Sequence, residues 1–263
     1  MKKMRKIAAA VLSLSLTVSF TGCGNKIAPN PVHSYDDLPG KTIGVQLGTV
    51  GNTYANDIEG ASVDCYSKGA DAVEALKQGK VDAVIIDAEP AKVFVSKNEG
   101  LQILDDPFVE EEYAIAIKKG NDELTEKINT ALAEIKADGT LDEITANWIG
   151  EEAGQHPYTS PEGTDRSNGV LVMATNPEFP PYESKSGEAV VGFDADMMQA
   201  LCDRMGYELT IESMAFDSII VAVDSGKADV GVAGMSVTEE RKENVNFSDP
   251  YTTATQVIIT RKD

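Results

Sequence analysis

Two stretches of this chain repeat one local pattern, and this repeat restricts the fold more than any other feature of the sequence. AVEALKQGKVDAVIID (72–87) and IIVAVDSGKADVGVAG (219–234) each have apolar residues at helical spacing, then a Gly-Lys turn, then an apolar run of strand length. TIGVQLGT (42–49) and VLVMATNP (170–177) form a second pair, each with an apolar strand that runs into a loop. Strands that alternate with helices indicate parallel βα units, so the sequence predicts an α/β protein of two related lobes.

The ends of these four predicted strands mark a candidate ligand site. They fall at Thr49, Asp87, Asn176 and the segment 234–236. Ligands of open α/β sheets bind beyond the carboxyl ends of the strands. Strand ends from two lobes that face one cleft are typical of a clamshell binding protein, whose lobes close over the ligand.

Charge and histidine content exclude several functions. The chain has a formal net charge of −20, which argues against nucleic-acid binding because that function requires basic patches to neutralise phosphates. Its two histidines, His33 and His156, lie in connecting segments without partners at ligand spacing. We therefore expect no metal site, no cofactor and no nucleic-acid partner.

The N-terminal segment has the pattern of an export signal. Basic MKKMRK precedes an apolar run (7–20) that is too short to span a membrane comfortably, and Cys23 follows a glycine shortly after it. A small residue before a cysteine resembles the bacterial lipobox, in which the cysteine carries the lipid. We predict a lipoprotein signal peptide at 1–23 with lipid attachment at Cys23, and a tether at 24–33. A signal peptide without lipidation is the alternative.

The other two cysteines, Cys65 and Cys202, fall in different predicted lobes. We therefore expect no internal disulfide, even in an oxidising compartment. Both are predicted to be small buried apolar residues.

The middle of the chain combines helices with a polar connection. Residues 121–150 have the periodicity of two amphipathic helices broken at Asp138-Gly139. Residues 151–168 are polar and rich in Pro, Gly, Ser and Thr, which is typical of a linker.

Longer motifs extend over nearly all of the chain after residue 33. They are LPGKTIGVQLGT (38–49), GKVDAVIID (79–87), NWIG (147–150), ATNPEFPPYE (174–183), VGFDADMMQAL (191–201), MAFDSII (214–220) and GMSVTEERKENVNFSDPY (234–251). Together they resemble the extracellular solute-binding proteins of polar amino-acid importers (solute-binding family 3, type II periplasmic-binding fold). The resemblance implies a two-lobe α/β clamshell that binds a free amino acid and docks on the permease subunits of an ABC importer.

The motifs stand in reversed order relative to that family. Residues 169–263 resemble the family's opening half, and residues 36–150 resemble its closing half. The chain is therefore identified as a circularly permuted member, in which the linker 151–168 joins the old termini.

This order predicts the lobe boundaries. Residues 34–115 would form the family's second lobe, and residues 116–263, linker included, its first. A single covalent crossover would lie in EEYAIAIKKG (111–120), because the chain stops where the family's other crossover would follow. We expect a monomer; pairing of lobes between molecules by domain swapping is the alternative.

Arg241 is the expected anion-binding residue. A guanidinium can bind a carboxylate through two parallel hydrogen bonds, and the SVTEE before Arg241 has the pattern of a capping box that begins at Ser236. The resemblance places the ligand carboxylate on Arg241, with Ser236 and Thr49 assisting. The alternative is a solvated helix charge beside Glu239 and Glu240.

Asp87 is the expected ammonium partner, because it ends the apolar strand AVIID beside the predicted cleft. The family's ammonium-binding aspartate matches this position. The alternative is an N-cap for the helix that starts near Glu89. Gly234, at the equivalent position in the other lobe, would contribute its backbone carbonyl and avoid a clash.

The resemblance also supplies side-chain walls and selectivity positions. Phe179 and Phe216 match the aromatic walls around the ligand side chain, with a role in the core as the alternative. Selectivity would be set at Asn176, Glu178, Gln46 and Ile86. Because Asn176 stands where binders of cationic residues often have Asp, we expect a polar or a basic amino acid.

These residues predict a lipid-anchored receptor of an amino-acid ABC importer, held outside the cytoplasm. Two alternatives use the same fold. A sensory module would bind the amino acid and act through a signalling partner. A secreted dehydratase would act on cyclic carboxylic acids, but Asp87 would repel a dicarboxylate and the predicted cleft has no His or Cys to transfer protons. We therefore expect no enzymatic activity.

Overall fold

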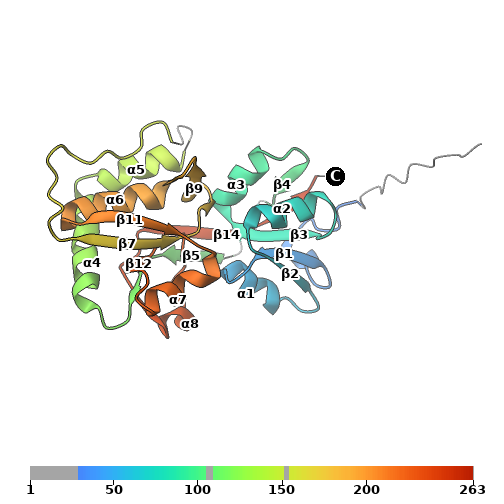
Figure 1. The fold of residues 1–263 in the computed structure, drawn as a ribbon. Helices are drawn as coiled ribbons and strands as arrows, with labels where there is room; N and C mark the ends of the chain where they lie inside the picture. Colours follow the sequence, from blue (N-terminus) through green and yellow to red (C-terminus); the bar gives the residue numbers. More distant parts are fainter. Residues whose placement is uncertain (1–28, 105–108, 151–153, 263) are drawn as a thin grey trace, which may run out of the picture.

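The structure is a computed structural model that describes residues 29–104, 109–150 and 154–262. Two lobes lie side by side (Figure 1). We call them the Asp87 lobe, built on a six-stranded sheet, and the Arg241 lobe, built on a five-stranded sheet. The predicted signal peptide, the lipid site at Cys23 and the first half of the tether (24–28) lie outside the described residues.

The Asp87 lobe contains the predicted parallel βα units. β1 runs parallel to both β2 and β3, and β14 joins the sheet antiparallel to β3. The sheet order is β2-β1-β3-β14-β4, with β5 also paired to β14. The strands are β1 (Thr42–Gln46), β2 (Ser62–Tyr66), β3 (Ala83–Asp87), β4 (Leu101–Ile103), β5 (Val109–Tyr113) and β14 (Thr252–Arg261), and the helices are η1 (Tyr35–Asp37), α1 (Val50–Asp57), α2 (Gly69–Lys77) and α3 (Ala88–Ser96).

The Arg241 lobe repeats this arrangement around β7, which runs parallel to β11 and β12. The sheet order is β11-β7-β12-β6-β13, and β8, β9 and β10 form a separate small sheet. The strands are β6 (Ala116–Lys118), β7 (Val170–Thr175), β8 (Glu178–Phe179), β9 (Glu183–Ser186), β10 (Ala189–Val191), β11 (Glu208–Ser213), β12 (Val230–Gly231) and β13 (Val245–Phe247), and the helices are α4 (Asp122–Ala137), α5 (Thr140–Trp148), α6 (Phe193–Met205), η2 (Phe216–Ser218), α7 (Ile219–Asp224) and α8 (Glu239–Lys242).

The predicted break between the helices of 121–150 is confirmed at Gly139. This residue has a φ of +86°, a left-handed conformation that glycine adopts without steric cost. α4 therefore ends and α5 starts in a new direction. Both helices pack on α6, and in the view of Figure 1 α5 lies above the sheet while α4 runs down its left side.

Alternating residues of β7 bury both faces of the second sheet. Leu171 and Met173 belong to the cluster that includes α4, α5 and α6, whereas Ala174 belongs to the cluster under α7. A strand buried on both faces reads as a continuous apolar run, as VLVMAT does. Each such side chain contributes about 1.5–3 kcal/mol when it is fully buried.

Two chain segments cross between the lobes, and not one as expected. The first runs from β5 to β6 within the predicted segment 111–120. The second runs from β13 to β14, and its Ser248 forms two hydrogen bonds with Ile115 of the first. The Ile115 N–H donates to the Ser248 hydroxyl at 3.0 Å, and the Ser248 N–H donates to the Ile115 carbonyl at 2.9 Å. The two crossings therefore form one paired hinge.

The same strand corrects the predicted lobe boundary. The expected range 116–263 assigns β14 to the Arg241 lobe, but β14 pairs with β3 and β4 in the other sheet. The run QVIIT (256–260) is buried throughout, and a fully buried strand needs a hydrogen-bonded neighbour on each side. β3 and β4 supply those neighbours, so residues 252–261 belong to the Asp87 lobe.

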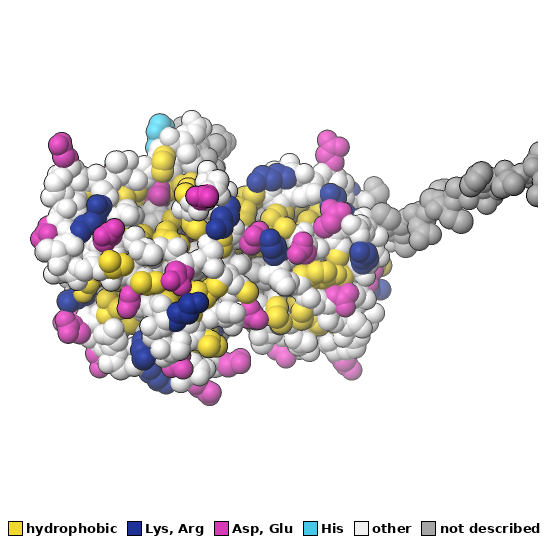
Figure 2. Space-filling view, in the orientation of Figure 1, with side chains coloured by type: hydrophobic (Ala, Val, Ile, Leu, Met, Phe, Trp, Pro, Cys, Tyr) yellow, Lys and Arg dark blue, Asp and Glu magenta, His cyan; other side chains and the backbone are white. Residues whose placement is uncertain are grey.

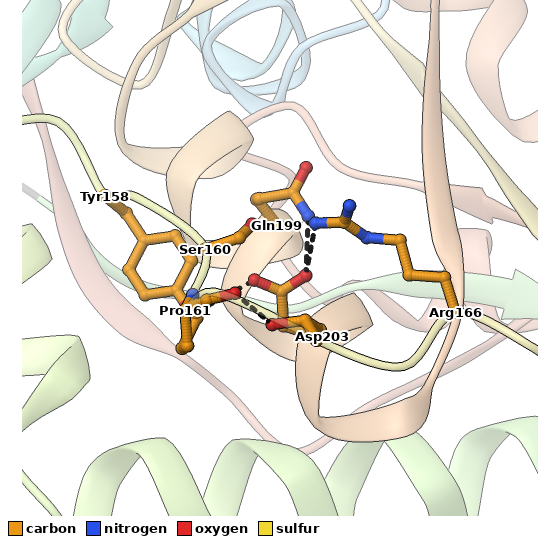
Figure 3. Close-up of polar contacts among 7 residues, drawn as sticks. Tyr158, Ser160, Pro161, Arg166, Gln199 and Asp203 are labelled. Carbon is orange, nitrogen blue, oxygen red and sulfur yellow. Dashed lines mark hydrogen bonds and ion pairs between the residues drawn. The ribbon is translucent and has the colours of Figure 1, made fainter.

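Residues 154–168, the described part of the predicted linker, form a strap along α6. The Tyr158 N–H donates to Asp196 at 2.8 Å, and its hydroxyl donates to Asp203 at 3.2 Å. Arg166 forms an ion pair with the other oxygen of Asp203 at 3.0 Å, and that carboxylate is only 3% exposed. Figure 3 shows both side chains turned toward Asp203. The composition predicts a loop, and these contacts fix its path.

The cysteines match the prediction in part. Cys202 is buried and Cys65 is exposed on β2, an edge strand of its sheet, so the expectation of burial is wrong for Cys65. No disulfide forms among the described cysteines.

The described surface mixes both signs of charge. On the face drawn in Figure 2, acidic side chains are spread over both lobes and interspersed with lysine and arginine. Within residues 29–104, 109–150 and 154–262, no helix is long and apolar enough to cross a membrane.

Candidate functional site

Strand ends from both lobes meet at one pocket, as the sequence predicts. The pocket has about 290 Å³ of unfilled space, its open mouth included. Nine of the eleven residues expected at the ligand site line it, so the predicted strand ends do come together at one pocket. The lining residues are Gln46, Thr49, Val50, Asp87, Asn176, Phe179, Phe216, Ala233, Gly234, Ser236 and Arg241.

Ile86 and Glu178 are the two expected residues that do not line the pocket. Ile86 precedes Asp87 on β3, and successive strand residues point to opposite faces of a sheet. Its side chain packs instead in the core against α2, where a Cβ on Gly69 would lie 2.9 Å from Ile86 Cδ1. Ile86 is therefore a packing residue.

The Arg241 guanidinium is buried between the lobes, and the alternative of a solvated helix charge is wrong. Only 8% of the residue is exposed. One nitrogen donates to the Ser236 carbonyl at 2.7 Å, and the other donates to the Gly48 carbonyl of the opposite lobe at 3.0 Å. The Phe216 ring lies 5.4 Å from the guanidinium carbon, which stabilises the cation through its π-face. Burial lowers the pKa of Arg241, and the nearby Glu111 raises it.

The capping box expected from SVTEE does not form, and the helix cap lies two residues after Ser236. Thr238, and not Ser236, is the N-cap of α8, because its hydroxyl oxygen accepts from the Arg241 N–H at 3.1 Å. The Ser236 side chain is thereby free to face the hinge and the pocket.

Asp87 occupies the N-cap position of α3, but its carboxylate does not cap the helix. The Tyr113 hydroxyl donates to its Oδ1 at 2.5 Å, and the Gln256 amide donates to the same oxygen at 2.8 Å. Burial, and next the negative charge of Glu111, raise the pKa of Asp87 to about 7. A carboxyl at this value exchanges its proton near neutral pH.

Glu111 is the site residue that the sequence analysis missed. It lies on the hinge strand β5, is buried, and accepts a hydrogen bond from the Ser236 hydroxyl at 2.6 Å. The run VEEEY resembles an exposed acidic edge. The burial of Glu111 could have been inferred because side chains along a strand alternate between the two faces of the sheet. This alternation places Glu111 on the same face as the buried Tyr113.

Gly234 allows a close approach of the two pocket walls. Its φ is +52°, and a Cβ at this position would lie 2.7 Å from Phe179 Cε1. Its N–H donates to the buried Asp194 carboxylate at 2.9 Å, which fixes the backbone. Phe179 is itself buried and stacks on Tyr182, with 5.9 Å between ring centroids. Phe179 is therefore both a pocket wall and a core residue.

We expect Gly234→Ala to destabilise the protein by about 1–3 kcal/mol, because the new methyl group requires Phe179 to move and alanine resists a positive φ. Thermal unfolding measures this loss. Gly187→Ala is the matched control, because Gly187 has a φ of +63° with no atom near its Cβ position. Equal destabilisation by both variants would contradict the proposed clash.

Direct contacts hold the lobes together across the cleft. The Gln46 amide donates to Asn176 Oδ1 at 3.0 Å, and Asn176 donates in turn to the Met214 carbonyl at 2.9 Å. Lys68 forms an ion pair with Glu178 at 2.8 Å. Glu178, expected to set selectivity, thus lies at the rim and has its charge compensated, while Gln46 and Asn176 face the pocket.

A family profile matches most of the chain. The profile of bacterial extracellular solute-binding proteins, family 3, matches residues 65–151 and 171–263. The chain therefore belongs to this family, with its two-lobe periplasmic-binding fold. The family's description is that of extracellular solute-binding proteins, and the relatives that match are named as amino-acid-binding proteins.

Individual relatives match shorter stretches. The arginine-binding extracellular protein ArtP of Bacillus subtilis is 39% identical over 105 residues, which are 40% of this chain and 41% of that protein. The L-cystine-binding protein TcyJ of Escherichia coli is 32% identical over 123 residues, 46% of each chain. The arginine-bound form of domain 1 from TmArgBP, a crystal structure, is 38% identical and covers 36% of this chain and 82% of its own, with a TM-score of 0.32. The chain thus spans less than half the length of these curated relatives.

The described residues contain no cluster of histidine, cysteine and acidic side chains that could hold a metal ion. The pocket offers instead a guanidinium, a carboxylate, amides and aromatic walls. Such a set suits a small zwitterion.

Proposed function

We propose that this chain is the receptor of an amino-acid ABC importer and that it binds a free polar or basic L-amino acid between its lobes. One observation carries the proposal: Arg241 and Asp87 come from different lobes and line one pocket. A zwitterion has a carboxylate for the guanidinium and an ammonium for the carboxylate. Because one ligand bridges both lobes, binding shifts the population toward the closed form.

The other lining residues receive matching roles. Ser236 and Thr49 assist Arg241 with the ligand carboxylate, and the Gly234 carbonyl accepts from the ammonium. Phe179 and Phe216 enclose the ligand side chain, and Gln46 and Asn176 contribute amides that select it. All of these residues line the pocket, which supports the assignment.

We further propose that the protein is a monomeric lipoprotein, anchored at Cys23 on the outer side of the cell membrane. The support is the basic, then apolar, then Gly-Cys order of residues 1–23. Two acyl chains hold a protein firmly at a membrane surface. The closed form would dock from there on the permease subunits.

Circular permutation is a separate proposal, which rests on the order of the motifs. The strap 154–168 leads from α5 to β7, so it stands where a permutation would join the old termini. A chain rebuilt with residues 169–262 ahead of 34–150, without the strap, should fold and bind the same amino acid. Failure of the rebuilt chain to fold would count against the permutation.

Calorimetric titration with the twenty amino acids tests the binding role. At least one polar or basic amino acid should bind with a stoichiometry of one. Uptake of that amino acid should fall in a strain deleted for the gene. Binding without any loss of uptake would contradict the importer role and favour a sensor, and no binding at all would overturn the proposal.

A further inference from the structure

We propose that Glu111 is a specificity-determining residue, and that with Asp87 it makes this pocket select cationic over neutral amino acids. This inference rests on the proposed function, in which Arg241 and Asp87 bind the backbone groups of the ligand. To that function the inference adds Glu111, which lies behind the pocket wall, and it specifies the class of ligand side chain that the pocket prefers.

A chain of hydrogen bonds joins Glu111 to the pocket. Its Oε2 accepts from the Ser236 hydroxyl at 2.6 Å and from the Gln256 amide at 3.4 Å. The same Gln256 amide donates to Asp87 at 2.8 Å. Ser236 and Asp87 both line the pocket. Glu111 thus lies one hydrogen bond behind Ser236 and two behind Asp87, and it is only 8% exposed.

The buried charges of this site do not balance. Asp87 and Glu111 contribute two carboxyl groups, and Arg241 contributes one guanidinium. The Lys68 ammonium, which bridges the two lobes, is already paired with Glu178. An uncompensated buried charge is costly. A neutral zwitterion leaves the excess carboxylate in place, whereas a ligand with one further positive charge compensates it.

Protonation of one carboxyl does not remove this preference. A proton on Asp87 would cancel the excess charge, but the ligand ammonium would then lose its carboxylate partner. Compensation by the ligand leaves the Asp87 carboxylate available to the ammonium.

An unpaired polar atom in the pocket wall points to the same class of ligand. Gln46 lines the pocket, is 4% exposed, and its Oε1 accepts no hydrogen bond from the described residues. This atom is an acceptor, and the side chains of lysine and arginine carry only donors. A donor-only side chain therefore satisfies what the pocket leaves open.

L-Arginine and L-citrulline are suitable probes, because they share their shape and differ by one positive charge. Calorimetric titration of the wild-type protein should show tighter binding of L-arginine. In Glu111→Gln, which keeps the shape and a hydrogen-bonding group, the ratio of the two affinities should fall at least about tenfold, because at an effective dielectric near 20 one charge acts by this factor from about 12 Å and by more when it is closer.

Glu110→Gln is the matched control, because Glu110 precedes Glu111 on the same strand and is exposed. This variant should keep the wild-type ratio. An unchanged ratio in a folded Glu111→Gln protein would overturn the inference. Equal or tighter binding of L-citrulline by the wild-type protein would overturn it without any variant. If only neutral amino acids bind, the receptor function stands and the charge selection fails; if none binds, both fail.

Discussion

Arg241→Ala is expected to weaken amino-acid binding more than any other single change at this site. Removing one partner of a buried, hydrogen-bonded charge pair costs about 2–5 kcal/mol, roughly a 30- to 5,000-fold loss of affinity. The guanidinium is buried and also bonds Gly48 of the opposite lobe, so its loss removes both a ligand contact and a closing contact. Titration calorimetry with the amino acid that the wild-type protein binds gives the ratio.

Two further arginine variants show whether the loss of affinity comes from the lost charge, from the lost hydrogen-bond geometry or from a general effect of removing an arginine. Arg241→Lys keeps the charge but cannot form two parallel hydrogen bonds to one carboxylate, so it should bind with intermediate affinity. Arg204→Ala removes a partly exposed arginine that pairs with Asp138 far from the pocket, and it should bind normally. Normal binding by Arg241→Ala would show that the carboxylate is held elsewhere.

Amino-acid affinity should depend on pH through Asp87, whose pKa is raised to about 7 by burial and then by Glu111. The ligand ammonium prefers the ionised carboxylate. Below pH 7 a proton must leave before the ammonium can bind, so affinity should fall by about tenfold for each further pH unit. Above pH 7 the carboxyl is already ionised, and affinity should level off.

The groups that face Asp87 define the control for this prediction. Tyr113 and Gln256 donate to its oxygen, and Glu111 and Arg241 act on it through their charges. Titrations at pH 6 in two buffers with different ionisation enthalpies should reveal a proton released on binding. Asp87→Asn should abolish that release and bind weakly at every pH. An affinity that is constant from pH 5.5 to 8 would contradict the assignment.

The same pKa predicts the opposite trend for the stability of the free protein. The folded pKa of Asp87 lies above its ordinary value of 3.8, so between about pH 4 and 7 the unfolded chain gives up this proton more readily than the folded one. The contribution of Asp87 to stability is therefore highest at low pH, falls as pH rises through this range and is constant above it.

The sequence located the pocket because its chemistry follows from local order. Asp87, Asn176 and Gly234 each come directly after a buried apolar strand, and parallel strands present these ends at one edge of a sheet. Their convergence needs only the βα repeat. The expected pocket position of Ile86 was wrong because one step along a strand reverses the direction of the side chain, so Ile86 and Asp87 cannot both face the pocket.

Longer-range features could not be derived in this way. The sequence of β14 reads as a buried strand, but not as one that belongs to the lobe encoded first. Glu111 looks like one of three acidic residues on an exposed edge, and only the approach of Ser236 across the hinge makes it a buried partner. The strap is polar in composition, and its path depends on Asp196 and Asp203 of α6. In each case the deciding partner is distant in sequence.

A crystal structure of the protein with its bound amino acid tests the central claim most directly. The account predicts one ligand between the lobes, with its carboxylate on the Arg241 guanidinium and its ammonium within hydrogen-bond distance of Asp87. A ligand bound on one lobe alone, or in the reverse orientation with its ammonium toward Arg241, would contradict it.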